Sequence, residues 1–243
     1  MHAKNSLTDN ADSYLESTEY LDSDHPLVVT TAEKLTQGAE SDVERIRAIY
    51  LYVRDLRYDV LESFRYLAAG QRSASAVLEH GVAFCMGKAS SFVALSRAAG
   101  VPARVAFQTL ESPEKEFLSL EVRALWGGKH GRPLPWHSLG EAFLNGRWVK
   151  LDATIEAATA ARLGKPYTQE FDGITDIHTV EGRILRENGS YADYPPEVAH
   201  WYEVVATAVL NGLDSAANRT RVAEDDDLWA GPSLDEVRRH AVL

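Results

Sequence analysis

The chain has 243 residues, of which 45% are hydrophobic and 25% are charged, and its formal net charge at pH 7 is −11. This composition is typical of a globular protein with a sizeable core. The negative charge argues against nucleic-acid binding, which needs a basic face. No apolar run approaches the ~20 residues that span a bilayer, and residues 1–24 lack the pattern of a secretory signal. A single cysteine cannot form an internal disulfide. We therefore expect a cytoplasmic protein that binds neither nucleic acid nor membrane.

The chain begins with a polar, acidic stretch and continues with helical patterns. We expect residues 1–25 to be a flexible acidic N-terminal arm, followed by a single domain over 26–243. A first helix is predicted over 30–37. Ser41 and Glu44 then form a capping box that opens an amphipathic helix. The apolar stripe of this helix consists of Val43, Ile46, Ile49, Tyr50, Val53 and Leu56.

Two further helices are predicted before the middle of the chain. A short one covers 75–79 and is closed by Gly81. The next covers 85–99, where Gly100 and then Pro102 provide the expected stop signals.

After this helix the apolar residues recur with a period of two, which is typical of strands. The alternation predicts strands over 103–109 and 118–126. Two more strands, over 138–144 and 147–152, flank a turn. A helix over 196–210 follows. Helices first and strands later indicate an α+β fold, in which the helix over 85–99 packs on an antiparallel sheet.

Asn145 and Gly146, between the last two strands, are the strongest short hairpin signal in the chain. If they form a two-residue turn, one aromatic pair and one opposite-charge pair face each other, and such pairs stabilise sheets by roughly 0.2–1 kcal/mol each. The predicted cross-strand pairs are Leu144 with Arg147, Phe143 with Trp148, Glu141 with Lys150, and Leu139 with Asp152.

The same register makes His137 and Asp152 diagonal neighbours on one face. Diagonal Cα atoms lie about 7–8 Å apart, so an imidazole and a carboxylate that extend toward each other can meet. The spacing therefore predicts an oriented His–Asp pair.

Cys85 is the candidate nucleophile for this pair. It opens a helix, where unpaired N–H groups and the helix dipole favour a thiolate, and the imidazolium of His137 would lower the thiol pKa further. Asp152 would hold the ring in the required tautomer. The N–H of Cys85 can donate to a developing oxyanion. No second oxyanion donor is assigned; Tyr58 and Gln71 lie upstream as weak candidates.

The residues around these three positions resemble the motifs of the transglutaminase-like superfamily. "GVAFCMGKASSFVALSRAAGVPARVAF" is similar to its nucleophile helix and the following Val-Pro-Ala-Arg step into a strand. "HSLGEAFLNGRWVKLDAT" is similar to its His-containing hairpin and its Leu-Asp-x-Thr motif. The resemblance covers about residues 42–155 and assigns Cys85 as nucleophile, His137 as base and Asp152 as orienting acid.

The resemblance implies a papain-like fold and a cysteine acyltransferase or an amidase or peptidase that works through an acyl-thioester intermediate. The substrate would be a small-molecule, peptide or carrier-bound acyl compound, and no cofactor or metal is expected. Leu139 stands where many members have an aromatic residue, and a long segment, 111–135, precedes His137. The C-terminal extension, 156–243, has no counterpart in these motifs. Hydrolysis and acyl transfer therefore both stay open.

Other interpretations compete with this one. The chain could be a non-catalytic binding module that keeps the fold, although a binder has no need of all three groups. A redox-responsive thiol protein is disfavoured because there is no resolving cysteine. A lone cysteine is also often a buried packing residue.

Several other polar or aromatic residues have a simpler structural interpretation. We expect Lys88 and Arg97 to be surface charges of their helix. Asp172 and Asp176 are expected in a solvated loop, because their spacing fits no metal-binding loop. Two neighbouring aromatic residues, Trp201 and Tyr202, are expected to face the core, with a rim over the active site as the alternative.

Overall fold

The computed structural model describes residues 11–111, 118, 120–126, 132–164, 171–180 and 182–240, which form helices packed around a sheet. The helices are η1 (Ala11–Leu15), α1 (Pro26–Thr36), α2 (Asp42–Asp55), α3 (Val60–Ala68), α4 (Ala74–His80), α5 (Cys85–Ala98), α6 (Leu120–Trp126), α7 (Ala157–Arg162), α8 (Pro196–Gly212), α9 (Ala216–Glu224), α10 (Asp226–Ala230) and α11 (Leu234–His240). The strands are β1 (Arg57–Tyr58), β2 (Val82–Ala83), β3 (Ala103–Leu110), β4 (Leu134–Leu144), β5 (Arg147–Leu151) and β6 (Ile184–Tyr191).

The main sheet has four strands in the order β5-β4-β3-β6, and every neighbouring pair is antiparallel. The predicted hairpin register is confirmed, since Phe143 faces Trp148 and Glu141 faces Lys150. Asn145 has a φ of 51°, and a positive φ is what a two-residue hairpin turn of this type requires. The α+β expectation with an antiparallel sheet is therefore confirmed.

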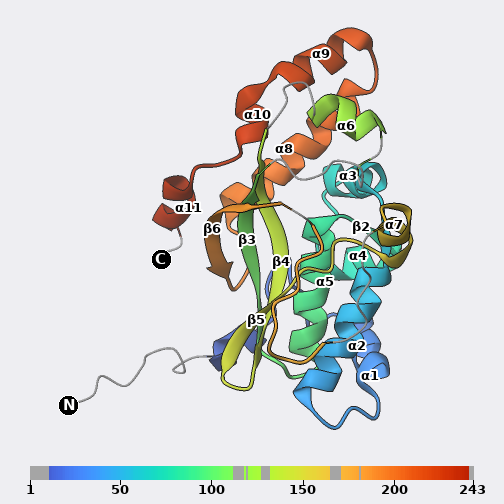
Figure 1. Ribbon diagram of the computed structural model, residues 1–243, viewed down its shortest axis with the longest axis vertical. Coiled ribbons are helices and arrows are strands. Elements are labelled where there is room, and N and C mark those ends of the chain that lie inside the picture. Colours follow the sequence, from blue (N-terminus) through green and yellow to red (C-terminus); the bar gives the residue numbers. More distant parts are fainter. Residues whose placement is uncertain are drawn as a thin grey trace, which may run out of the picture.

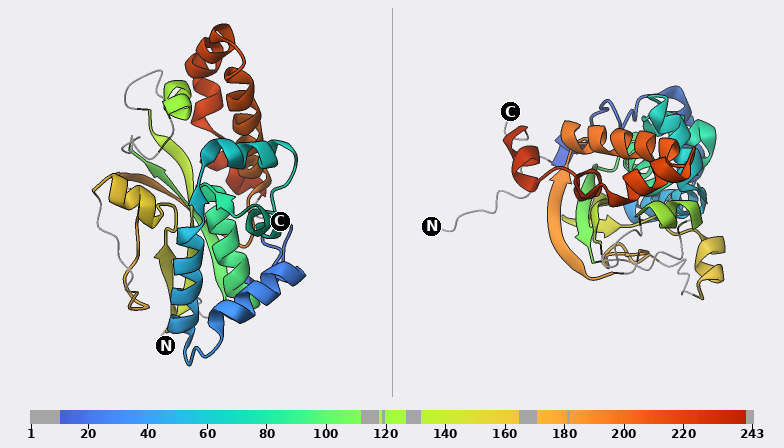
Figure 2. Two further views of the ribbon diagram at one scale, coloured as in Figure 1. Left: turned by 90° about the vertical axis from the view of Figure 1, so that its right-hand side faces the viewer. Right: turned by 90° about the horizontal axis from the view of Figure 1, so that it is seen from above.

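Helix α5 packs directly against β4, and helices α1, α2 and α4 lie on the same side of the sheet (Figures 1 and 2). The contact with β4 is close: a Cβ added at Gly140 would lie 2.1 Å from the ring of Phe92. A glycine at this position lets α5 approach the strand that carries His137. The predicted helix-on-sheet arrangement is confirmed.

The surface position expected for Lys88 and Arg97 is wrong. Because α5 is covered all round, Lys88 is 1% exposed and donates a hydrogen bond to the carbonyl of Arg54 at 2.7 Å. Burial lowers the pKa of Lys88 to about 8, despite opposing charges nearby, and that of Arg97 to about 10. Arg97 donates hydrogen bonds to three backbone carbonyls, those of Glu16, Ala103 and Ala192.

The expected strand over 118–126 is also wrong, because the described part of this segment is helix α6. Leu120, which the alternation would place with the buried residues, is 74% exposed. Val122 is buried, as the alternation predicts, but Leu125 is buried too, and a spacing of three is helical. A period-two pattern in a short segment can therefore coincide with one face of a helix.

Part of the N-terminal segment packs against the rest of the fold. Leu21 is fully buried and Tyr20 is nearly so. The carbonyl of Glu16 accepts a hydrogen bond from Arg97, which ties the segment to α5. The flexible arm stays a prediction, and residues 1–10 lie outside the described residues. Helix α1 also begins four residues earlier than predicted, with Pro26 in its first turn and a hydrogen bond from the N–H of Leu27 to the ring of His25.

The C-terminal extension completes one end of the molecule. The predicted helix over 196–210 is confirmed as α8, which is two residues longer. Helices α6, α8, α9 and α10 gather at one end of the sheet, and α11 lies on the side opposite α5 (Figures 1 and 2). Helix α3, which was not predicted, packs against α8 at this end. Strand β6, also not predicted, forms one edge of the sheet. No helix among the described residues combines the length and apolar character that crossing a membrane requires.

Candidate active site

Cys85 is the first residue of α5, as its position in the sequence predicts. Phe84 precedes it as the N-cap residue in an extended conformation, and no side chain caps the helix. The first N–H groups of an α-helix have no partner within the helix, and the helix dipole is positive at this end. The backbone therefore presents hydrogen-bond donors and a favourable potential where the sulfur lies.

His137 on β4 and Asp152 just after β5 form the predicted pair. Nε2 of His137 lies 3.2 Å from Oδ2 of Asp152, and both side chains are buried. Three backbone N–H groups also donate to this carboxylate: those of Thr154 at 3.0 Å, Thr179 at 3.1 Å and Val180 at 3.1 Å. Because a carboxylate only accepts hydrogen bonds, Nε2 carries a proton and Nδ1 is left as the basic nitrogen.

The residue before His137 has an unusual backbone conformation. Trp136 has a φ of 52°, which is rare for any residue other than glycine. Its side chain is fully buried, and its indole N–H donates to the carbonyl of Pro232 at 2.8 Å. A residue held in this region costs of the order of 1–3 kcal/mol and alters the direction of the chain. The packed indole therefore fixes the bend from which the His137 ring projects.

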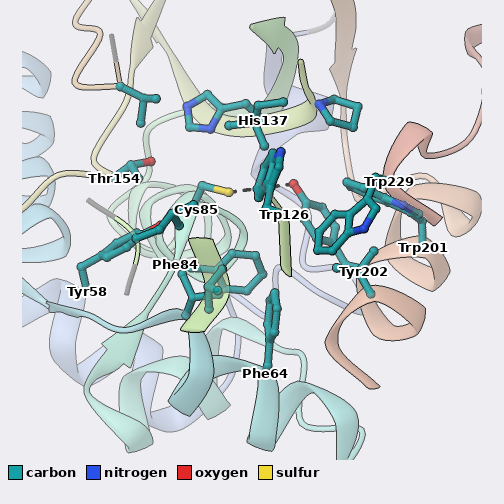
Figure 3. A pocket seen from close by; sticks show the side chains of 17 residues that line it. Tyr58, Phe64, Phe84, Cys85, Trp126, His137, Thr154, Trp201, Tyr202 and Trp229 are labelled. Atoms are coloured by element: carbon teal, nitrogen blue, oxygen red, sulfur yellow. Dashed lines mark hydrogen bonds between the residues drawn. The ribbon is translucent and has the colours of Figure 1, made fainter. Parts of the chain in front are cut away.

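The imidazole of His137 lies beside the Cys85 side chain (Figure 3). Nδ1 is buried and lies near the sulfur, and among the described residues no other polar atom forms a hydrogen bond with it. The Cys85 sulfur also contacts the hydroxyl of Tyr202 at 3.9 Å, and that hydroxyl donates its own proton to the carbonyl of Trp136. Toward the sulfur, the phenol oxygen can therefore act only as an acceptor. The imidazole is a far stronger base, so we expect His137 to take the thiol proton.

The charges of the three groups support one another. Burial raises the pKa of the Cys85 thiol, but the hydrogen bond and charge of His137 outweigh it, and the pKa lies below its ordinary value. Burial lowers the pKa of His137, yet the charge of Asp152 raises it to about 10. Burial likewise opposes ionisation of Asp152, but His137 and the donated hydrogen bonds hold its pKa well below the usual range. The arrangement favours a thiolate–imidazolium pair that is held by a permanently ionised acid.

A pocket opens at these residues, and Cys85 and His137 form part of its wall (Figure 3). Trp201 and Tyr202 of α8 pack against the core, as expected, and both also line this pocket. Tyr58 lines the pocket as well. Gln71 does not line the pocket, and its side-chain oxygen is hydrogen-bonded to the ring of His80 at 2.7 Å. Of the two weak oxyanion candidates, the structure brings only Tyr58 to the cysteine.

The sequence offered little information about the remaining walls. Residues from α3, α6 and α10 line the pocket too, and these helices lie far from Cys85 along the chain. Phe64, Val122 and Trp229 are examples from these three helices. Their apolar character suits any core, so no pattern distinguished them as pocket residues.

Asp172 and Asp176 are not part of this site. Oδ1 of Asp172 accepts from the N–H groups of Ile174 and Thr175, and Asp176 accepts from the N–H of Lys150. Both aspartates are exposed, as the solvated-loop interpretation predicts. In the described parts of the chain, no three His, Cys, Asp or Glu side chains group as metal ligands would.

With this geometry established, the comparison with known families is direct. The family model of the transglutaminase-like superfamily matches residues 29–153, just over half of the chain. The chain belongs to the transglutaminase-like superfamily. The matched segment contains Cys85, His137 and Asp152 and ends one residue after the last of them. Membership supports cysteine-dependent catalysis in general and leaves the specific reaction open.

Among solved structures, the chain is similar to a "putative cysteine protease" from Cytophaga hutchinsonii. The two are 21% identical, with a TM-score of 0.42, and the match covers 60% of this chain and 42% of that protein. The likeness is too weak to support an argument about function. No curated protein sequence matches the chain.

Proposed function

We propose that the protein is a cysteine-dependent acyl-transfer or amide-hydrolysing enzyme that uses Cys85, His137 and Asp152. The observation that carries the proposal is the single buried cysteine at a helix N-terminus, beside a histidine whose other nitrogen is bonded to a buried aspartate. Cysteine, histidine and an orienting acid in this order supply a nucleophile, a proton carrier and a group that fixes the tautomer.

The reaction begins when the Cys85 thiolate attacks the carbonyl carbon of an amide or thioester. The charge that develops on the carbonyl oxygen is stabilised by the backbone N–H of Cys85. The hydroxyl of Tyr58 is our candidate for the second donor, because burial raises its pKa well above 10 and keeps it protonated. The imidazolium of His137 then gives its proton to the leaving group, and an acyl-thioester on Cys85 remains.

The acyl group leaves when water or an amine attacks the thioester, with His137 acting as base. The geometry is compatible with both acceptors, so hydrolysis and transfer to an amine are both within the proposal. The donor can be a small molecule, a peptide or a carrier-bound acyl compound.

Intact-protein mass spectrometry tests the proposal. The protein is mixed with acetyl-N-acetylcysteamine, a small thioester, and the mass is followed over time. We expect one acetyl adduct that is absent in Cys85→Ala and forms far more slowly in Asp152→Asn. A folded protein that forms no adduct, and whose Cys85 also fails to react with chloroacetamide, would instead be a non-catalytic binding module.

A further inference from the structure

The pocket beside Cys85 is almost entirely apolar. Its wall includes six large apolar side chains from five parts of the fold: Phe64, Phe84, Val122, Trp126, Trp201 and Trp229. None of the described residues that line it is Asp, Glu, Lys or Arg. The catalytic groups, with Tyr58, Tyr202 and Thr154, supply its polar atoms.

Most of the polar atoms in the aromatic wall are already engaged. The indole N–H of Trp201 donates to the carbonyl of Leu228 at 2.7 Å, and that of Trp229 donates to the carbonyl of Val222 at 2.8 Å. Apart from His137 Nδ1, the indole N–H of Trp126 is the only buried polar atom of the pocket wall without a partner among the described residues. The wall therefore presents ring faces and aliphatic groups to an occupant.

The apolar wall discriminates between acyl groups by the free energy that it costs to remove water from them. A carboxylate, an ammonium or a primary amide that entered the pocket would lose its hydration and find too few partners. An apolar group would gain by leaving water and would contact aromatic rings. An acyl group with a charged or carboxamide end is therefore a poor occupant.

The position of the pocket fits an acyl group. The space between its walls is about 650 Å³ when the part open to solvent is counted. Cys85 and His137 line the same pocket as the aromatic side chains, so a carbonyl at the sulfur places the rest of the acyl group between the aromatic walls (Figure 3).

We propose that the acyl group accepted by Cys85 is uncharged and apolar, such as an arylacetyl or medium-chain alkanoyl group. This inference rests on the proposed acyl-thioester chemistry. In the step concerned, the Cys85 sulfur forms a bond to the acyl carbon, and the bond from that carbon to the leaving sulfur or nitrogen breaks. The proton held by His137 goes to the leaving group.

A series of acyl-N-acetylcysteamine thioesters tests the proposal with the unmodified protein. The series contains acetyl, pentanoyl, glutaryl, octanoyl and phenylacetyl groups, and mass spectrometry gives the rate of Cys85 acylation. Glutaryl matches pentanoyl in length and differs by a terminal carboxylate. We expect phenylacetyl and octanoyl to react at least tenfold faster than acetyl, and glutaryl at least tenfold slower than pentanoyl. Glutaryl equal to pentanoyl, or phenylacetyl no faster than acetyl, would overturn the proposal.

A binding measurement separates this proposal from the chemistry on which it rests. Cys85→Ala is titrated with pentanamide and with its charged counterpart glutaramate, and the tryptophan fluorescence of the pocket is followed. Preferential binding of pentanamide without any acylation of the wild type would support the pocket and defeat the proposed reaction. Acylation without a preference for apolar groups would support the proposed reaction and defeat the proposed selectivity of the pocket.

Two phenylalanine substitutions on α6 locate the selectivity. Val122 is 2% exposed and lines the pocket, whereas Leu120, two residues away, is 74% exposed and does not. In Val122→Phe the added ring occupies the pocket, and we expect the phenylacetyl-to-acetyl rate ratio to fall at least fivefold. Leu120→Phe should keep the ratio. If Val122→Phe does not fold, Val205→Phe on α8 replaces it. A folded pocket variant with an unchanged ratio would contradict the proposal.

Discussion

The two sides of the pocket beside Cys85 differ in the chemistry of their side chains. On the side of α5 and the β4–β5 hairpin, His137 and Asp152 are held by short-range hydrogen bonds, four of which end on a single carboxylate. On the side of α3, α6, α8 and α10, the wall consists of aromatic and aliphatic side chains with little free hydrogen-bonding capacity. The first side supplies charge and protons, and the second excludes water. Changes to the first should affect every substrate alike, and changes to the second should alter selection among substrates.

The largest effect is expected for Asp152→Asn. The amide cannot bind the imidazolium as a carboxylate does, and it reverses the preferred tautomer of His137, so we expect turnover of all acyl thioesters to fall by roughly 10³–10⁴-fold. Steady-state kinetics with two thioesters of different acyl groups measures this. Asp172→Asn, in an exposed loop, is the control and should keep full activity. If Asp152→Asn slowed one acyl group and spared the other, the division between the two sides would be wrong.

A second prediction concerns Lys88, which lies buried one turn after Cys85. Its pKa is lowered from 10.5 to about 8 by burial, so between these values the unfolded state binds a proton that the folded state does not. The contribution of Lys88 to stability should therefore rise with pH over this window, by roughly 3 kcal/mol. Urea unfolding at pH 7.5 and 10.5 measures the free energy of unfolding of the wild type and of Lys88→Met.

The difference in the free energy of unfolding between wild type and Lys88→Met, followed against pH, separates the effect of Lys88 from that of other titrating groups. Lys34→Met, at an exposed position of α1, is the matched control and should show no such dependence. A difference between wild type and Lys88→Met that stays constant with pH would mean that Lys88 is hydrated in solution.

A smaller effect is expected at the contact between α5 and β4. Gly140→Ala places a methyl group against the Phe92 ring, and overpacking of this kind typically costs 1–3 kcal/mol. Chemical unfolding should show this loss. Phe92→Leu in the same chain should restore part of it, and a double-mutant cycle gives the coupling. If the losses of unfolding free energy in the two single variants simply add up in the double variant, Gly140 and Phe92 are not in tight contact.

The β4–β5 hairpin could be predicted from the sequence because the residues that determine it are close together in the chain. Asn145 and Gly146 fix the turn, and a turn of defined length fixes the pairing of every residue on both strands. The positions of His137 and Asp152 follow from that register. Helix α5 was equally accessible, since Gly100 and Pro102 mark its end.

Other features of the fold could not be predicted in this way. Lys88 and Arg97 are charged residues that usually lie at a surface, and only the packing around α5 shows that they are buried. Leu120 and Val122 alternate like strand residues, although their burial follows a helical period. Tyr202 meets Cys85 across 117 positions of the chain, and no local pattern encodes such a contact.

The most direct test of the central claim is the reactivity of Cys85 at low pH. An ordinary thiol with a pKa near 8.5 is less than about 1% thiolate at pH 6, whereas the lowered pKa of Cys85 keeps a larger fraction of it ionised. Iodoacetamide should therefore add once to the folded protein at pH 6, and the rate should fall as the pH drops through the lowered pKa. In His137→Ala only the helix terminus favours the thiolate, by about 0.3–1 kcal/mol, so alkylation should be much slower. Labelling only in denaturant would make Cys85 a packing residue, and equal rates in the two proteins would remove His137 as its partner.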